Sequence, residues 1–326
     1  MSRLPGLPIR LCERSQWAII GCVALCVTVL IVVTAVAQAP SDVLQDNQVT
    51  EQEPITPIPA PPAADPLKLA LGERLFSDKR LSANGKLACS SCHDIRANGA
   101  RPNDNHVSRP FDTLTVFNAA LNYRLNWEGN YRSPAAQIVS SLENPVNMAT
   151  NLGEVVRKLK SDPAMVYQFH AAYGGGPSAE RLLDALVVFE KSLVTPGARF
   201  DRWLGGDPSA LSSAELEGYR QFKSLGCSAC HQGVNVGGNL MQRQGVFHPL
   251  VQGQPEIVRV PSLRNVAATA PYFHDGSAAT LQDAVRRMAA AQLDRTLNDQ
   301  QVESLVAFLR TLTGNYRGAP VAGGAP

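Results

Sequence analysis

The sequence carries little net charge. Its 30 lysine and arginine residues nearly balance 28 aspartate and glutamate residues, which gives a net charge of +2 over 326 residues. Charged residues make up only 18% of the chain. Proteins that bind nucleic acids depend on an excess of basic side chains that neutralise phosphates. The composition therefore gives no reason to expect a nucleic-acid partner.

The chain also has few cysteines available for disulfides. Of its seven cysteines, Cys12, Cys22 and Cys26 lie in the N-terminal segment, and the other four lie in two short motifs. The rest of the chain has no thiol left for a disulfide. This usage is typical of an exported protein whose cysteines attach a cofactor rather than cross-link the fold.

Those four cysteines belong to a repeated C-x-x-C-H motif, at residues 89–93 and 227–231. In this pattern each thiol forms a thioether bond to a haem vinyl group, and the adjacent histidine becomes a ligand of the iron. Two intervening residues let both sulfurs reach vinyl groups on one edge of the porphyrin. The predicted cofactor-binding residues are Cys89, Cys92, His93, Cys227, Cys230 and His231.

Two other uses of paired cysteines fit the motifs poorly. A redox-active C-x-x-C needs no histidine and follows a β-strand. A zinc site built from four thiolates does not place a histidine directly after each pair. The sequence therefore predicts two covalently attached c-type haems.

The first 39 residues have the pattern of a membrane-targeting segment. Arginines precede an uncharged run at residues 17–37, which is about long enough to cross a bilayer. A signal peptide cleaved after residue 39 is the alternative, but Pro40 is a poor first residue for a mature chain. We expect a retained anchor in the inner membrane, with the rest of the protein in the periplasm. Residues 40–65 are rich in proline and predict an extended tether.

Helical periodicity dominates the remainder. Apolar residues recur at helical spacing in residues 66–76, 181–194, 212–225, 280–291 and 298–312. A glycine- and proline-containing stretch at residues 205–208 interrupts this pattern and indicates a domain boundary. We therefore expect a mainly α fold with two cytochrome c-like haem domains, residues 66–205 and 206–316, and a flexible tail at residues 317–326.

A loop follows the first motif. Residues 98–105 are rich in asparagine, glycine, proline and aspartate, and His106 lies at their end. A histidine on a loop beside a haem can bind the vacant face of the iron and can be withdrawn with the loop. We expect His106 to be such a sixth ligand rather than a solvated side chain.

Longer segments carry a family resemblance. They are residues 114–120, 126–129, 144–148, 233–239 and 260–277. In sequence and order they resemble segments of the bacterial di-haem cytochrome c peroxidases. The resemblance runs from about Pro66 to Tyr316, which leaves only the N-terminal segments and the tail outside it.

The resemblance implies a division of labour between the haems. It places Met288 as the distal ligand of the C-terminal haem, opposite His231, and His/Met ligation raises the reduction potential. This haem would accept electrons from a small cytochrome c or a cupredoxin. Hydrogen peroxide would react at the N-terminal haem, bound by His93, once His106 leaves. Related methylamine-utilisation enzymes have a tyrosine where this chain has Met288, so that residue favours the peroxidase branch.

The resemblance implies two further features between the domains. Trp127 matches a tryptophan that lies between the haems. A calcium ion would be bound by the side chain of Asp112 and the backbone carbonyls of Thr269 and Pro271, which suits a cation that prefers oxygen ligands. Asparagine is common at the position of Asp112, and the added negative charge does not disfavour a cation. Family members are commonly homodimers.

One departure from the family pattern affects catalysis. The family uses a glutamate to move a proton during peroxide cleavage, and the matching residue here is Asn147. An amide can donate a hydrogen bond but cannot exchange a proton at neutral pH. Gln137, which matches a glutamine near the same pocket, has the same limitation. Glu143 is the nearby carboxylate that we expect to substitute, and the enzyme is expected to be slow.

Three functions remain open on the sequence alone. The first is a cytochrome c peroxidase that reduces hydrogen peroxide to water. The second is a di-haem oxidase that modifies a partner protein or a small molecule. The third is a di-haem electron carrier without catalytic activity. They differ in what happens when the half-reduced protein meets peroxide.

Overall fold

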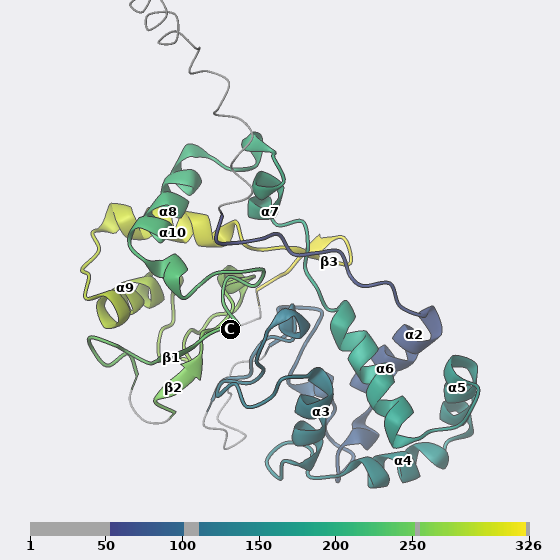
Figure 1. Cartoon of the computed structure of the whole chain (residues 1–326). Coiled ribbons are helices and arrows are strands. Elements are labelled where there is room, and N and C mark those ends of the chain that lie inside the picture. Colours follow the sequence, from purple (N-terminus) through teal and green to yellow (C-terminus); the bar gives the residue numbers. More distant parts are fainter. Residues whose placement is uncertain (1–52, 101–110, 252–254, 324–326) are drawn as a thin grey trace, which may run out of the picture. The chain divides into compact units, whose positions relative to one another are not determined.

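The computed structural model describes residues 53–100, 111–251 and 255–323, which belong to one folded unit. This part of the chain is mainly helical, as predicted (Figure 1). Its α-helices are α2 (Pro66–Phe76), α3 (Pro134–Glu143), α4 (Leu152–Lys160), α5 (Pro163–Tyr173), α6 (Ala179–Ser192), α7 (Arg199–Leu204), α8 (Ser213–Ser224), α9 (Leu281–Leu293) and α10 (Asp299–Arg310).

The remaining regular elements are short. Strand β1 (Met241–Arg243) pairs with β2 (Ile257–Arg259), and β3 (Asn315–Tyr316) pairs with β4 (Ala319–Pro320); both pairs are antiparallel. Single 3₁₀ turns occur at Lys79–Leu81, Cys89–Ser91, Ala119–Leu121, Pro208–Ala210, Cys227–Ala229 and Val266–Ala268.

Buried apolar side chains form two clusters. The first draws on α2 to α6 and contains Leu75, Phe169 and Phe189 among its fully buried members. The second draws on α7 to α10. Helix α7 precedes the predicted domain boundary, but its Phe200 packs into the second cluster and contacts Phe308 with ring centroids 5.1 Å apart. Each C-x-x-C-H motif thus has a hydrophobic cluster beside it.

Each cluster contains a close pair of helices that depends on a glycine. In the first, a Cβ atom added to Gly72 of α2 would collide with the carbonyl oxygen of Ala185 in α6. In the second, a Cβ atom on Gly218 of α8 would collide with the carbonyl oxygen of Ser304 in α10. Because the side chains at a contact set the distance between helix axes, these glycines let each pair approach closely.

We expect Gly218→Ala to destabilise the second cluster by about 1–3 kcal/mol, the usual cost of overpacking a filled core. Alanine favours a helix more than glycine does, but here its methyl group meets backbone atoms that cannot rotate away. Thermal unfolding followed by circular dichroism measures the loss. Gly176→Ala is the control, since a Cβ atom there meets nothing within 4 Å. Equal midpoints for the two variants would contradict the packing argument.

Side chains cap the N-termini of α8, α9 and α10. The N–H of Glu215 donates to Ser212 Oγ at 3.3 Å, and the N–H of Ser212 donates to Glu215 Oε2 at 2.8 Å. Asn298 and Gln301 form the same reciprocal pair at the start of α10. Thr280 caps α9. These contacts satisfy N–H groups that the helices leave without intrahelical partners, and so fix where the helices begin.

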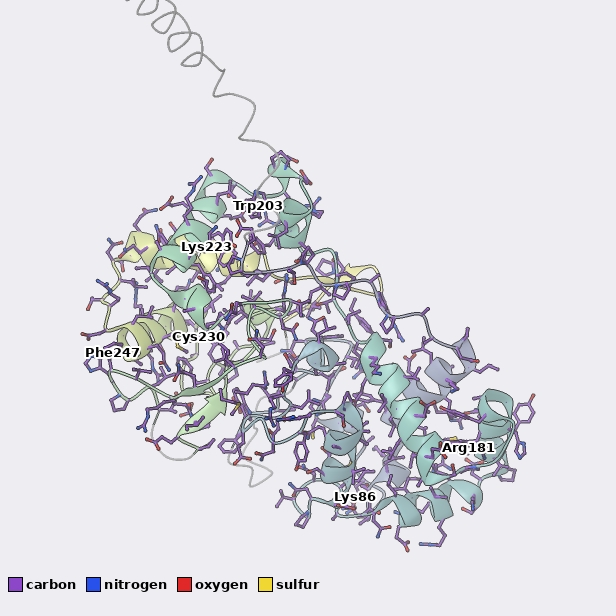
Figure 2. The ribbon with its side chains drawn as sticks, viewed as in Figure 1. Lys86, Arg181, Trp203, Lys223, Cys230 and Phe247 are labelled. Carbon is purple, nitrogen blue, oxygen red and sulfur yellow. The ribbon has the colours of Figure 1, made fainter. Side chains whose placement is uncertain are left out.

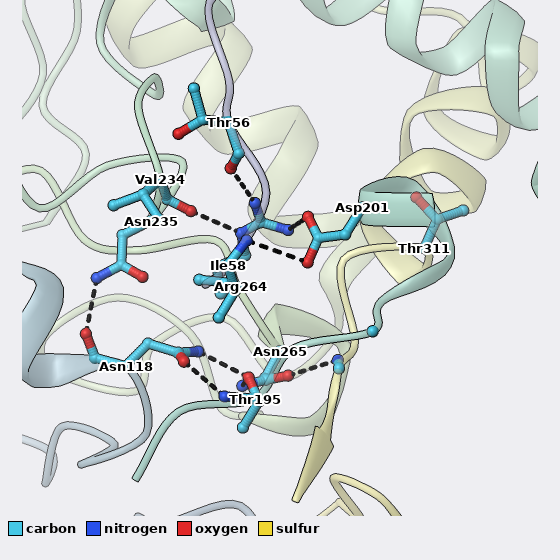
Figure 3. A network of polar contacts seen from close by, with 12 residues as sticks. Thr56, Ile58, Asn118, Thr195, Asp201, Val234, Asn235, Arg264, Asn265 and Thr311 are labelled. Atoms are coloured by element: carbon cyan, nitrogen blue, oxygen red, sulfur yellow. Dashed lines mark hydrogen bonds and ion pairs between the residues drawn. The ribbon is translucent and has the colours of Figure 1, made fainter. Parts of the chain in front are cut away.

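A buried ion pair holds the N-terminal end of the described chain against the second cluster. Arg264 Nη1 donates to Asp201 Oδ1 at 2.6 Å, and the two side chains are 1% and 5% exposed (Figure 3). The same guanidinium donates to the carbonyl oxygens of Val234 and Thr56. The N–H of Ile58 donates to Asp201 Oδ2 at 3.4 Å. Thr56 and Ile58 belong to the predicted tether, residues 40–65, and these contacts pack that part of it on the fold.

A second polar network joins segments that belong to the two halves of the chain. Asn118 and Thr195 exchange hydrogen bonds of 2.8 Å, and Asn265 Nδ2 donates to Thr195 Oγ1 at 3.0 Å (Figure 3). Asn235 Nδ2 donates to the carbonyl oxygen of Asn118 at 2.8 Å. Buried polar groups that are hydrogen-bonded in this way favour one arrangement of the loops that carry them.

The predicted membrane anchor, residues 17–37, lies outside the described residues. Within the described ranges, no helix has both the length and the apolar character required to span a bilayer.

Candidate haem sites

The first C-x-x-C-H motif forms a tight turn beside a cavity. A 3₁₀ turn begins at Cys89, and the N–H of His93 donates to the carbonyl oxygen of Cys89 at 2.9 Å. His93 Nδ1 lies 3.3 Å from the carbonyl oxygen of Gly99. Such a contact fixes Nδ1 as the protonated nitrogen and leaves Nε2 for a metal. Cys89, Cys92 and His93 line a cavity of about 310 Å³, called the N-terminal cavity below.

The second motif repeats this geometry. The N–H of His231 donates to the carbonyl oxygen of Cys227 at 3.0 Å, and His231 Nδ1 lies 3.2 Å from the carbonyl oxygen of Val236. Cys230 lies beside β1, with the amide nitrogen of Gln242 3.9 Å from its sulfur (Figure 2). Burial lowers the pKa of His231 to about 4, so the imidazole is neutral, as a ligand must be.

The cavity beside the second motif is apolar and close to the motif residues. A space of about 220 Å³, called the C-terminal cavity below, and a second of about 100 Å³ are both lined by Cys227, His231 and Met288.

No disulfide joins the motif cysteines. Burial raises the pKa of the Cys89 thiol to about 12 and that of Cys227 to about 11, which reflects their apolar surroundings. Two thiols and an imidazole beside a cavity at each motif fit a covalently attached haem.

The predicted distal ligand of the C-terminal haem, Met288, is among the described residues. Met288 is on α9 and lines the same two spaces as His231. It is half-buried, between the buried Ala284 and Ala289. The other predicted distal ligand, His106, lies outside the described residues.

Two of the residues predicted to act on peroxide line the N-terminal cavity. Gln137, on α3, and Asn147, after that helix, both face it. Gln137 Nε2 donates to Ser141 Oγ at 3.2 Å, while Gln137 Oε1 is buried with no hydrogen-bond partner in the described structure. Glu143 is exposed and is not part of the cavity wall. The structure therefore brings Gln137 and Asn147 together but leaves Glu143 in solvent.

The sequence reasoning missed a carboxyl group in the same cavity. Glu190, on α6, lines the N-terminal cavity, and burial raises its pKa to about 8. A signal was present, because Glu190 follows Leu186 by one helical turn on the apolar face of α6. A carboxyl group within an apolar stripe is a candidate for a perturbed pKa, because burial disfavours its charged form.

The N- and C-terminal cavities share a wall. Trp127, Asp112 and Arg259 are among the residues that line both. Trp127 Nε1 donates to the carbonyl oxygen of Asp112 at 2.9 Å, and the N–H of Arg259 donates to the carbonyl oxygen of Trp127 at 2.8 Å. The predicted inter-haem tryptophan thus lies in the wall between the two candidate haem sites.

The residues predicted to bind calcium also lie near one another. Asp112, Thr269 and Pro271 all line the C-terminal cavity. A Cβ atom on Gly276 would lie 2.6 Å from Asp112 Oδ2 and 3.1 Å from Pro271 Cγ, so this glycine packs against two of the three. Among the described residues no cluster of three or more His, Cys, Asp or Glu side chains could hold a metal. The predicted set depends on backbone carbonyls instead.

Comparisons with known proteins agree with this geometry. Residues 66–209 match the family model described as di-haem cytochrome c peroxidase, and residues 216–313 match that described as cytochrome c. The chain is 38% identical over 283 residues to a cytochrome c551 peroxidase of Nitrosomonas europaea, covering 81% of this chain and 85% of the relative. It is 35% identical over 269 residues to a cytochrome c551 peroxidase of Pseudomonas aeruginosa, covering 75% and 78%.

A solved structure has the same fold. A MauG-like protein associated with microbial copper homeostasis superposes with a TM-score of 0.67 at 25% identity, over 79% of this chain and 93% of that chain. Because it covers 79% of this chain, the superposed part is longer than either predicted domain and therefore includes residues of both.

Proposed function

Since this chain belongs to the di-haem cytochrome c peroxidase family, we propose that its two haem sites divide the work of reducing hydrogen peroxide to water. The protein is an oxidoreductase that acts on peroxide with electrons from a redox protein. When bound, the haems supply one-electron redox chemistry and an iron at which the peroxide bond is cleaved. The observation that carries the proposal is that two C-x-x-C-H cavities meet at one wall, which contains Trp127.

The C-terminal site receives electrons. His231 and Met288 would ligate its iron, and this pair favours the reduced state. Exposed apolar side chains lie nearby, on β1, on β2 and in the residues beside them: Leu240, Met241, Val246, Phe247 and Ile257. They support docking of a small cytochrome c or a cupredoxin close to Cys230. Trp127, in the shared wall, lies on the way to the other haem.

The N-terminal site binds peroxide. His93 would ligate the iron, and withdrawal of His106 would open its other face. Gln137 and Asn147 can orient peroxide by hydrogen bonds from their amides, but neither can exchange a proton. Glu190 lies in the same cavity with a raised pKa, and such a carboxyl group can hold a proton at neutral pH.

Other parts of the proposal concern the surroundings of the enzyme. We propose a periplasmic location, with residues 17–37 anchoring the chain in the inner membrane, because c-type haem is attached outside the cytoplasm. We also propose a homodimer, because members of this family are commonly homodimers. Separation of membranes from soluble protein before and after removal of residues 1–39 tests the anchor, and sedimentation of the soluble form tests the dimer.

We also propose that calcium bound at Asp112, Thr269 and Pro271 holds the shared wall. Asp112 lines both cavities, whereas Thr269 and Pro271 line the C-terminal one, so an ion bound by all three would tie the shared wall to the C-terminal site. A calcium chelator is expected to lower peroxidase turnover, and added calcium but not magnesium should restore it, because magnesium needs a smaller, near-ideal octahedral site.

Asp112→Ala should weaken calcium binding in isothermal titration, while Asp112→Asn should retain much of it because the amide keeps an oxygen ligand. Chelator-treated protein with full turnover would contradict the calcium proposal and leave the peroxidase proposal intact.

Stopped-flow mixing of the half-reduced protein with hydrogen peroxide tests the function. The proposal predicts rapid loss of peroxide, followed by oxidation of an added cytochrome donor over many turnovers. A long-lived oxidised state without donor turnover would instead favour a di-haem oxidase. No spectral response would leave an electron carrier and overturn the proposal.

A further inference from the structure

Arg259 is a buried cation in the wall between the two cavities. It ends β2 and is only 4% exposed. It lines both the N-terminal and the C-terminal cavity, and among the described residues it is the only lysine or arginine that does so. Its position is therefore common to the two candidate haem sites.

The described structure offers Arg259 no acidic partner. Its Nε donates to the carbonyl oxygen of Asn126 at 3.0 Å, and Nη1 lies 3.5 Å from the carbonyl oxygen of Val260. Burial alone lowers the pKa of Arg259 to about 10, so the guanidinium still carries its charge at neutral pH. The carbonyl contacts orient the group without neutralising it.

Another buried arginine, Arg264, does have an acidic partner. Only five positions further along the chain, it forms a 2.6 Å ion pair with Asp201. Arg264 lines none of the three cavities at the haem motifs. Burying a charge without an opposite charge costs several kcal/mol. This contrast indicates that the negative charge that pairs with Arg259 belongs to a group bound in the cavities.

A haem brings the missing charge, because each porphyrin carries two propionate carboxylates. Guanidinium is the side chain best suited to carboxylates, since its planar fork can donate two parallel hydrogen bonds. We propose that Arg259 is a shared propionate-binding residue that pairs with a carboxylate of each haem. One cation then stabilises the reduced state at both centres, because positive charge near an iron favours the gain of an electron.

This inference rests on the proposed function only for its two haems, and its test does not depend on turnover. In full-length protein with both haems attached, Arg259→Gln should lower both reduction potentials in a spectroelectrochemical titration. Arg220→Gln is the matched control, since Arg220 lies on α8 with a side chain 68% exposed and lines none of the three cavities at the haem motifs. It should move neither potential. Unchanged potentials in Arg259→Gln, or a shift at one haem alone, would overturn the shared role.

A second variant keeps the test decisive if Arg259→Gln fails to attach both haems. Arg259→Lys preserves the charge but cannot donate as a fork. The propionate-bending bands of both haems in resonance Raman spectra should therefore shift in this variant. Bands identical to those of the unsubstituted protein would contradict the proposal. A protein with two haems that left peroxide unreacted would refute the proposed function without touching this inference.

Discussion

Replacing Asn147 by glutamate should raise the rate of peroxide turnover by about 100-fold or more, the usual contribution of one general acid or base. Asn147 lines the N-terminal cavity with Gln137, and neither amide can accept a proton from one peroxide oxygen and return it to the other. A carboxylate at position 147 supplies that transfer. Steady-state oxidation of a cytochrome donor measures the gain, and a single-turnover experiment assigns it to the peroxide step.

Two controls accompany this substitution. Asn147→Gln changes the shape of the side chain without adding a titratable group, so it should not accelerate turnover. Glu143→Gln should leave the rate unchanged, because Glu143 is exposed and does not line the cavity. An Asn147→Glu variant no faster than the unsubstituted protein would show that proton transfer is already provided. Glu190, the acid that lines that cavity, would then be the residue to replace.

Replacing Met288 by histidine should lower the reduction potential of the C-terminal haem by a few tenths of a volt, within the ~0.8 V range that axial ligands cover. A tenfold change in a one-electron equilibrium corresponds to ~59 mV, so the donor would then reduce this haem several thousandfold less favourably or worse. Donor-driven peroxidase activity should collapse accordingly. A potentiometric titration of the visible spectrum measures the shift directly.

Met241→Leu is the control for this prediction. Met241 is 41% exposed on β1 and lines none of the cavities at the haem motifs, so its loss should leave the potential unchanged. If Met288→His kept the original potential, Met288 would not be the ligand, and the division of labour between the two sites would lose its physical basis.

Much of the scaffold could be predicted because its signals are local. A C-x-x-C-H pentapeptide folds into the same turn at Cys89 and at Cys227, with the histidine N–H bonded to the first cysteine carbonyl in each case. Helix starts at Ser212 and Asn298 follow from side chains that satisfy N–H groups three residues away. Such contacts depend on few neighbours, so sequence spacing suffices to find them.

The lining of the N-terminal cavity was harder to predict because its residues meet only in the tertiary fold. Glu143 is close to Asn147 in sequence, but it ends α3 on the solvent side, while Glu190 reaches the cavity from α6. The shared wall brings Trp127 and Arg259 together from segments 132 positions apart. Local periodicity does not predict a contact between segments so far apart. An isolated arginine in a short strand also resembles an ordinary surface residue in the sequence.

Electron paramagnetic resonance of the fully oxidised and the half-reduced protein tests the central claim, that two haems on one chain differ in their outer ligands. The account predicts two distinct ferric signals in the oxidised protein. Addition of one electron should abolish the signal of the haem bound by His231 and Met288 and leave that of the haem bound by His93. A single signal, or two signals that disappear together, would contradict the account.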